Sequence, residues 1–176
     1  MIYRTLTQKE ISPSLFAHFQ RHQTVNKCWR KAEDGSWTIK EDPFIDDWSE
    51  EDYQFLVSCL KHTIATGGIV IGAFEQEQLK GFVSVEADRM GSQKEYLDLT
   101  SIHISEDIRR KGIGRELFSR AAQWAREHGG KKLYISAHSA VETQAFYRAL
   151  GCTEAVEYQQ SHVAQEPYDV QMEYVL

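Results

Sequence analysis

The sequence predicts a single α/β domain in which a mixed β-sheet of about six to seven strands carries helices on both faces. Three observations lead to this fold class. The 176 residues fit one domain of ordinary size. The second half of the chain alternates β-branched runs with two amphipathic segments. Between them lies a strand–helix–strand unit, whose two strands are expected to be parallel with a right-handed crossover. We therefore expect one domain over residues 1–176.

The first part of the chain, residues 1–68, is expected to consist mainly of helices with irregular joints. Residues 12–13 are a Ser-Pro pair, which is typical of a helix start. Residues 34–35, an Asp-Gly pair, predict a turn. Ser49 is a candidate N-cap with Asp52 at the capping-box position, and apolar residues then recur at helical spacing. A double glycine ends this predicted helix.

The remaining residues, 69–176, carry most of the sheet. Apolar and β-branched runs bounded by polar turns or glycines mark the strands. The predicted strands are residues 69–74, 79–87, 96–104, 133–137, 152–158 and 170–175, with a possible edge strand at residues 1–6. The predicted helices are residues 112–128 and 141–150. The polar segment 159–169 is expected to be a hairpin loop between the last two strands.

Composition excludes several classes of protein. The net charge of −6 disfavours a nucleic-acid binder, because phosphate contacts need a basic face. The three cysteines form no CxxC or CxxH pair, so neither a disulfide framework nor a metal site is expected. No apolar run approaches the ~20 residues of a membrane span, and no signal-peptide pattern opens the sequence. These observations predict a cytoplasmic protein without a membrane partner, and they are compatible with a homodimer.

The most informative segment joins the strand that ends at Ile104 to the helix that begins near Gly112. Four basic residues lie in or beside this loop: Arg109, Arg110, Lys111 and Arg115. The first N–H groups of a helix have no partner within the helix, and the helix dipole is positive there. Glycine also lets an anion approach the backbone closely. The loop therefore predicts an anion-binding site, although it lacks the Gly-Lys-Ser/Thr of a P-loop and the third glycine of a Rossmann fingerprint.

The run Arg109-Arg110-Lys111-Gly112-Ile113-Gly114 resembles the acetyl-CoA signature of the GNAT superfamily, Gln/Arg-x-x-Gly-x-Gly/Ala. The preceding strand, residues 97–104, resembles the central strand of that family. Further along, Phe146-Tyr147 followed by Gly151 resembles its Phe-Tyr-x-x-x-Gly-Phe block. The resemblance covers residues 69–176 as an acetyl-CoA-binding core. Residues 1–68 match only as the variable region that carries acceptor specificity.

The resemblance implies an acetyl-CoA-dependent N-acetyltransferase. Such an enzyme transfers an acetyl group to a primary amine of a small molecule or peptide by direct attack in a ternary complex. It implies that the pyrophosphate of CoA lies on the backbone amides of residues 110–115, which include Ile113 and Gly114. It also implies that the pantetheine arm lies beside Ile102, His103 and Ile104, where two strands splay apart.

The sequence departs from the family pattern near the thiol end of the cofactor. Ala140 stands where many members carry Asn, so Ser139, Thr143 and Gln144 are candidates for that contact. The alternative function is a catalytically inactive acyl-CoA-binding sensor or scaffold of the same fold. A nucleotide-binding module built on the same glycine loop is a further alternative.

Two residues are predicted to move protons. Tyr147 matches the family tyrosine near the CoA sulfur, and a phenol with a pKa of ~10 stays protonated at neutral pH, which suits a general acid. Asp98 matches the position of a catalytic Glu in the histone-acetylating branch and is the candidate base, acting directly or through water. Strand alternation places His103 on the opposite face from Asp98 unless a bulge re-aims it. His103, Glu86 and a water chain are the alternative bases.

The acceptor is predicted to be a cationic amine. An acidic run contains Asp42, Asp46, Asp47, Glu50, Glu51 and Asp52. Aromatic residues lie near this run: Trp29, Trp37, Phe44, Trp48 and Tyr53. Carboxylates and aromatic rings together favour an ammonium group by charge pairing and cation–π contact. The alternative is a solvated acidic loop beside ordinary helix packing. The segment 159–169 is expected to cover the acceptor cleft.

Overall fold

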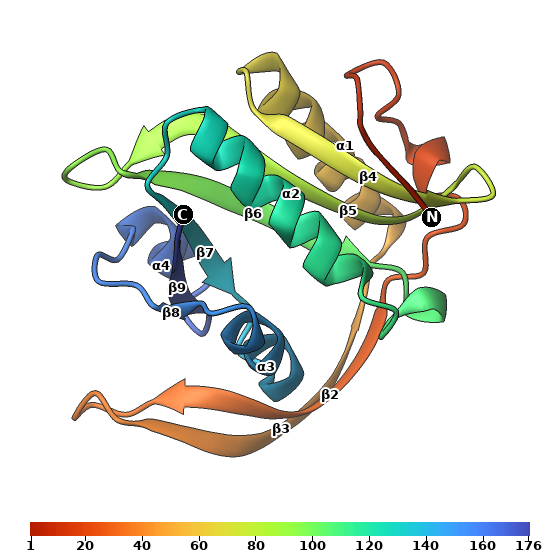
Figure 1. Cartoon of the computed structure of the whole chain (residues 1–176). Coiled ribbons are helices and arrows are strands. Elements are labelled where there is room, and N and C mark those ends of the chain that lie inside the picture. Colours follow the sequence, from red (N-terminus) through yellow and green to blue (C-terminus); the bar gives the residue numbers. More distant parts are fainter.

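A seven-stranded mixed sheet forms the centre of the computed structural model, which describes residues 1–176 (Figure 1). The strands are β1 (Ile2–Thr5), β4 (Ile69–Glu75), β5 (Gln78–Met90), β6 (Tyr96–Ile104), β7 (Lys132–Ala137), β8 (Thr153–Glu154) and β9 (Val170–Val175). Their order across the sheet is β1-β4-β5-β6-β7-β9-β8. Strands β6 and β7 are parallel and every other pair is antiparallel. The predicted mixed sheet is confirmed.

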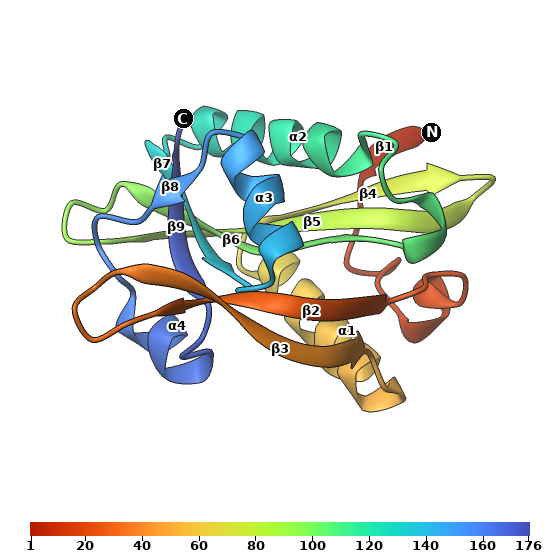
Figure 2. The same cartoon turned by 90° about the horizontal axis from the view of Figure 1, so that it is seen from below.

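Helices cover both faces of this sheet (Figure 2). Helices α2 (Ile113–Glu127) and α3 (Val141–Ala149) lie on one face, and α1 (Glu50–Ala65) and α4 (Gln160–Gln165) lie on the other. The strand–helix–strand unit β6-α2-β7 therefore has the expected parallel strands. Helix α2 presents a fully apolar face to the sheet, and Leu117 in its middle is 0% exposed.

Helix α1 begins where the sequence predicted. The Ser49 hydroxyl accepts a hydrogen bond from the Asp52 N–H, and the Asp52 carboxylate accepts one from the Ser49 N–H, which completes a capping box. Leu56, Val57 and Leu60 on its inner face join a second apolar cluster beneath β4 and β5. The two clusters therefore cover opposite faces of the sheet, with α2 packed on one face and α1 on β4 and β5 of the other.

The prediction that residues 1–68 are mainly helical is wrong. Only one turn of 3-10 helix (Pro13–Phe16) precedes α1, and β2 (His22–Lys31) pairs with β3 (Trp37–Asp47) in a separate two-stranded sheet. The turn at residues 34–35 is confirmed, with Gly35 at φ +83°. Most of β3 is exposed, so no regular apolar period reveals the strand in the sequence.

The β2–β3 hairpin is anchored at its middle. The Trp29 N–H donates to the Ser139 carbonyl at 2.8 Å, and Cys28 forms an isolated bridge with Ala140. Val25, Cys28 and Ala140 bury one another completely. The hairpin therefore runs across the start of α3 and forms a wall on the face of the sheet opposite α2 (Figure 2).

The prediction of a strand over residues 152–158 is also too long. Only Thr153–Glu154 pairs with β9, and the predicted loop at 159–169 contains α4. The Glu157 side chain accepts hydrogen bonds from Ser92 at 2.8 Å, across the end of the β5–β6 loop. Closer to β8, the Val156 N–H donates to the Glu173 side chain at 3.1 Å instead of to the β9 backbone, so the strand pairing does not continue.

Replacing Leu117 with alanine tests the packing of α2 on the sheet. Because the side chain is fully buried, Leu117→Ala is expected to lower the free energy of unfolding by about 2–5 kcal/mol in urea denaturation. Phe55→Ala is the matched control, since Phe55 is 73% exposed and its loss should cost below about 0.5 kcal/mol. Equal effects of the two substitutions would contradict this packing.

Candidate active site

The sheet opens between β6 and β7. These strands pair only at Tyr96–Lys132, Leu97–Leu133 and Asp98–Tyr134. Beyond Asp98, β6 stays paired with β5 as far as Ile104, whereas β7 stays paired with β9 as far as Ala137. The edge of β6 that faces β7 is therefore free of strand pairing over residues 99–104. This is the splay that the resemblance implied.

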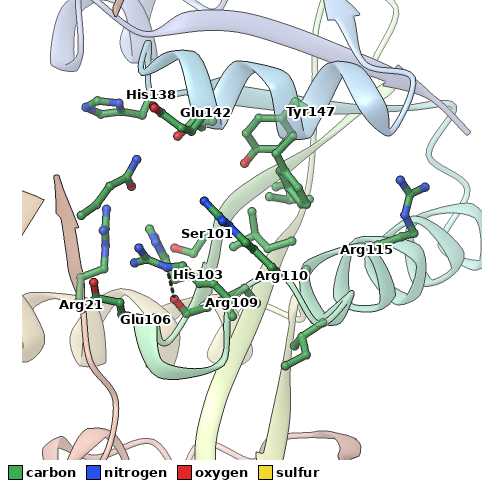
Figure 3. A pocket seen from close by; sticks show the side chains of 18 of the residues that line it. Arg21, Ser101, His103, Glu106, Arg109, Arg110, Arg115, His138, Glu142 and Tyr147 are labelled. Carbon is green, nitrogen blue, oxygen red and sulfur yellow. Dashed lines mark hydrogen bonds between the residues drawn. The ribbon is translucent and has the colours of Figure 1, made fainter. Parts of the chain in front are cut away.

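A cleft of about 1030 Å³ occupies the opening (Figure 3). It takes in residues from both faces of the sheet. Its α2-side wall comes from the loop before α2, the start of α2 and the inner side of α3. Its opposite wall comes from β2, the end of β7 and the segment just before β9. A molecule on one face can therefore meet a molecule on the other through the gap.

The loop before α2 leaves a run of backbone N–H groups without protein partners. Arg110 has φ +66° and Gly112 has φ +80°, and these left-handed residues turn the chain into the helix. The first helical hydrogen bond runs from the Glu116 N–H to the Gly112 carbonyl at 3.1 Å. No N–H group of residues 110–115 donates a backbone hydrogen bond. These free donors lie at the start of α2, where the helix dipole also favours negative charge.

Basic side chains around this loop differ in position. Those of Arg110 and Arg115 line the cleft, and Figure 3 shows Arg110 reaching into it. Arg109 also lines the cleft, but its Nε–H donates to the Ile104 carbonyl at 3.3 Å, which ties the loop to the end of β6. Lys111 is exposed and does not line the cleft.

Gly114 allows α2 and α3 to meet beside the cleft. A Cβ atom at this position would lie 3.1 Å from the ring of Phe146, which is tighter than ordinary packing. Ile113 next to it is buried in the main apolar cluster. The predicted motif residues are therefore brought together. Gly112 allows the turn into the helix, Gly114 allows the close approach of α3, and Ile113 packs in the core.

Tyr147 lies on α3 and lines the cleft. The residue is 6% exposed, and Figure 3 shows its hydroxyl pointing into the space between α3 and β6. Burial raises the pKa of this phenol, and the charges of Cys152 and Asp169 raise it further. The hydroxyl is therefore protonated at neutral pH and is able to donate a proton or hydrogen bond into the cleft.

Of the three candidates for the contact made by the family Asn, which are Ser139, Thr143 and Gln144, only Thr143 lines the cleft. The Gln144 side chain is buried, and its amide donates to the carbonyl of His138, directly after β7, at 2.9 Å. Ser139 accepts a hydrogen bond from Arg30 at 2.7 Å and faces a second cavity. Ser139 precedes α3 and Gln144 is buried on it, and neither side chain lines the cleft.

A β-bulge corrects the predicted faces of β6. Ser101 pairs with Ser84 but Leu99 pairs with Val85, so Thr100 is an extra residue and the alternation shifts by one. Ile102 and Ile104 pack on the α2 side in the main cluster. His103 lies on the opposite side, with its ring centroid 4.7 Å from that of Trp48. His103 and Asp98 therefore share a face, contrary to simple strand alternation.

The environment of His103 makes it a weak base. It lines the cleft between Trp48 and Phe82. Burial, and then the positive charges of Arg21 and Arg109, lower the pKa of the imidazole to about 3. The ring is therefore neutral at physiological pH, and its affinity for a proton is far below that of an ordinary histidine.

Asp98 lies outside the cleft, beneath α4. The His162 Nε2–H donates to the Asp98 Oδ2 at 2.7 Å, and the His162 ring stacks on Tyr134 with centroids 5.5 Å apart. Glu86, the alternative acid, accepts a hydrogen bond from Thr63 and does not line the cleft either. The parallel β6–β7 pairing at Asp98 closes the sheet at that point, so its carboxylate cannot reach the gap.

A second cavity of about 410 Å³ adjoins the cleft on the hairpin side. It is lined by Arg30, Asp42, Phe44, His138, Ser139, Glu166, Tyr168 and Asp169. His138, Glu166 and Asp169 line both cavities, so the two spaces lie side by side. Arg30 pairs with Asp42 and lies 4.7 Å from the Tyr168 ring centroid. The remaining carboxylates give this space an acidic surface.

The acidic run predicted on the acceptor side is dispersed by the fold. Asp42 lines the second cavity, whereas Asp46 pairs with Arg21 and Asp47 with His22 across the hairpin. Glu50, Glu51 and Asp52 form the first turn of α1. Among the predicted aromatic residues, Phe44 and Trp48 line the cavities. Trp29 and Trp37 pack against the main core, and Tyr53 against the second cluster.

Several lining residues carried no local signal in the sequence. These are Arg21, Ser136, His138, Glu142, Glu166 and Asp169. They come from the hairpin, the end of β7, the start of α3 and the segment before β9, and only the folded sheet assembles them. The position of Asp169 directly before a predicted strand was the one available indication.

The family follows from the sequence match. A model of the acetyltransferase (GNAT) family matches residues 21–152, and the chain belongs to that family. No curated protein sequence matches the chain at a significant level. No helix reaches the length and apolar character that crossing a membrane requires. No group of three His, Cys, Asp or Glu side chains is arranged to hold a metal ion.

Solved acetyltransferases have a similar fold. Nourseothricin acetyltransferase superposes with a TM-score of 0.70 at 18% identity, covering 99% of this chain and 97% of that one. A Bacillus anthracis str. Ames protein described as a streptothricin acetyltransferase was solved with acetyl coenzyme A. It superposes with a TM-score of 0.72 at 17% identity, covering 99% of this chain and 96% of that one. PaiA N-acetyltransferase of Thermoplasma acidophilum, solved with coenzyme A, superposes with a TM-score of 0.61 at 15% identity, covering 99% of this chain and 98% of that one.

The ion pair between His162 and Asp98 predicts a pH-dependent contribution to stability. The hydrogen bond to Asp98 raises the pKa of His162 above that of a free histidine, against the opposing effect of burial. A raised folded-state pKa stabilises the fold fully below the unfolded pKa of ~6.5, and this stabilisation is lost as pH rises through the folded pKa. His162→Gln is therefore expected to lower the unfolding free energy more at about pH 5.5 than at about pH 9.

Urea unfolding of the wild type and His162→Gln at the two pH values measures this difference. His62→Gln is the control, because His62 is on α1 and forms no ion pair. A loss from His162→Gln that is independent of pH would contradict the ion pair.

Proposed function

We propose that the protein is an acetyl-CoA-dependent N-acetyltransferase that acts on a cationic primary amine. The observation that carries this proposal is the cleft through the splayed sheet, with the free N–H groups of residues 110–115 at one end. Membership of the GNAT acetyltransferase family supports the same reaction class. Both substrates are expected to bind before transfer, one on each face of the sheet.

The α2 side of the cleft suits acetyl-CoA. The N–H groups of residues 110–115 would hold the pyrophosphate, with Arg110 and Arg115 adding positive charge. The free edge of β6 beside Ile102 and Ile104 would accept the pantetheine amides as an added strand. These features fit a long anionic molecule with an amide-containing arm. The thioester end would then lie near Tyr147 and Thr143.

The opposite side suits an amine. Glu166 and Asp169 line both the cleft and the second cavity, and Asp42, Phe44 and Tyr168 extend that cavity. Carboxylates attract an ammonium group, and aromatic faces add cation–π attraction. A second cavity beyond the gap leaves room for an acceptor larger than a simple alkylamine. We therefore propose a small-molecule amine or a peptide amine as the acceptor.

The reaction releases two protons from the acceptor ammonium. Acetyl-CoA supplies the acetyl group as a thioester, and a carbon–nitrogen bond forms as the carbon–sulfur bond breaks. The ammonium carries three protons and the amide product carries one. We assign one proton transfer to Tyr147, whose hydroxyl would donate to the departing thiolate and then be reprotonated from the cleft. The other proton leaves through a base on the acceptor side.

Asp98 was the base that the sequence favoured, but it supports α4 instead of facing the gap. Through His162 it holds the helix whose C-terminal end leads to Glu166 and Asp169. We therefore propose a positioning role for Asp98. His103 is not an effective proton acceptor because its pKa is about 3.

Thiol release from acetyl-CoA in the presence of amines tests the proposed function. The panel should contain diamines, lysine peptides, and nourseothricin and streptothricin, because two similar structures are named as acetyltransferases of these compounds. Amine-dependent thiol release is expected. Tight binding of acetyl-CoA without turnover of any amine would favour the inactive sensor or scaffold, and absence of binding would contradict the proposal.

Gly112→Glu is expected to weaken acetyl-CoA binding at least ~10-fold, about 1.4 kcal/mol, by placing a negative charge beside the anion site. Gly35→Glu is the matched control. Gly112 and Gly35 have φ of +80° and +83°, and a Cβ at either meets no atom within 4 Å, so both substitutions carry the same backbone strain. Calorimetric titration measures the affinities, and equal weakening by both variants would contradict the anion site.

Tyr147→Phe tests the proposed acid. Loss of the hydroxyl is expected to lower kcat by about 10²–10⁴-fold with little change in acetyl-CoA affinity, because the ring still packs against Phe146. Tyr174→Phe is the control, since Tyr174 packs on Phe118 away from the cleft. A normal kcat in Tyr147→Phe would show that the phenol does not transfer the proton.

A further inference from the structure

Asp169 occupies the place where the two cavities meet. It directly precedes β9, and its neighbour Val170 pairs with Ala137 at the end of β7. This end of β7 is the one that has diverged from β6, so Asp169 lies on the open side of the splay. Asp169 lines both the cleft and the second cavity. An acceptor amine that approaches the gap from the hairpin side has to pass it.

One oxygen of Asp169 is fixed and the other is available. The Ser136 hydroxyl donates to Asp169 Oδ2 at 3.0 Å, and the Asp169 N–H donates to the Glu166 carbonyl at 3.0 Å. No protein group donates to Oδ1, which is not among the buried unpartnered atoms. The side chain is therefore held by Ser136 of β7 and the backbone by Glu166, while Oδ1 remains free to accept a hydrogen bond from an ammonium group.

The other acids of the cleft are differently placed. The carboxylates that line it are Glu106, Glu142, Glu166 and Asp169. Glu106, Glu142 and Glu166 are exposed, whereas Asp169 is half-buried. A half-buried carboxylate has less water to compete with an ammonium group, so its charge acts more strongly on a ligand. Asp169 is also close enough for its charge to raise the pKa of Tyr147, the proposed acid.

From this geometry we infer that Asp169 is the catalytic base, binding the reacting ammonium through Oδ1 and accepting its proton. The inference rests on the proposed function and names the group that completes it. One ammonium proton passes to Asp169 and then to solvent, which leaves a lone pair on the nitrogen for the carbonyl carbon. Tyr147 gives its proton to the departing thiolate, and the second proton, which leaves the nitrogen as the amide forms, passes through the cleft to reprotonate Tyr147. The net reaction releases one proton to solvent.

The surroundings of Asp169 suit this role. Burial raises the pKa of its carboxyl, and the nearby charge of Glu166 adds to this effect. The Ser136 hydrogen bond and the positive charges of His138 and His162 act in the opposite direction. A carboxyl with a raised pKa is a stronger proton acceptor than a free one, although the carboxylate form is still needed.

Asp169→Asn is the decisive variant, because amide and carboxylate have nearly the same size. At about pH 7 it is expected to lower kcat/KM by about 10²–10⁴-fold, while acetyl-CoA affinity stays unchanged. Without the base, only acceptor that has already lost its proton can react. The remaining kcat/KM of the variant should therefore rise about tenfold per pH unit toward the amine pKa of ~10, and the difference in kcat/KM between wild type and variant should shrink. Asp88→Asn is the control, since Asp88 is exposed and lies outside the cleft.

Ser136→Ala provides a second readout. Because the Ser136 hydroxyl lowers the pKa of Asp169, its removal should shift the acidic limb of the kcat/KM profile to higher pH. A structural role alone would lower kcat/KM equally at all pH values and leave this limb in place.

The outcomes separate the inference from the proposed function. If the wild type acetylates an amine and Asp169→Asn keeps its kcat/KM, or loses it equally at all pH values, Asp169 is not the base and the acetyltransferase stands. If the wild type binds acetyl-CoA but acetylates no amine in the panel, the proposed function fails, and the base assignment fails with it.

Discussion

The divergence of β6 and β7 after the Asp98–Tyr134 pair is the constraint on which the rest of the protein depends. Backbone N–H and C=O groups need partners, so two parallel strands separate only when each has another neighbour. Here β5 holds β6 and β9 holds β7. The antiparallel insertion of β9 beside β7 therefore opens the sheet without breaking it, and it leaves one edge of β6 able to pair with an extended ligand.

The same divergence brings the two halves of the proposed chemistry together. On one face, the loop of residues 110–115 presents free N–H groups, and α3 presents Tyr147. On the other face, β9 begins at the open end of β7, which places Asp169 against the gap. The Asp98–His162 pair fixes α4, and with it the segment that carries Glu166. The proposed acid, the proposed base and the proposed anion site are thus positioned by the strands of a single sheet and by the helices and loops that follow these strands.

The parts of this arrangement that the sequence predicted are those encoded locally. Gly112 and Gly114, within a basic loop after a strand and before an amphipathic helix, were sufficient to predict a loop with free N–H groups at the start of α2. Ser49 and Asp52 were sufficient to predict the start of α1. The bulge at Thr100 was not predictable, because it depends on the register between β5 and β6. The β2–β3 hairpin was missed because its strands are mostly exposed and lack a regular apolar period. Asp169 gains its role only from tertiary neighbours.

The central claim is that acetyl-CoA binds along β6 and over the start of α2. Backbone amide NMR during an acetyl-CoA titration tests it most directly. The N–H resonances of residues 110–115 and of the free β6 edge, residues 99–104, are expected to shift together and saturate with one Kd, while those at the hairpin tip near Gly35 remain unchanged. Saturable shifts confined to other parts of the chain, or no saturable shift at residues 110–115, would contradict the claim.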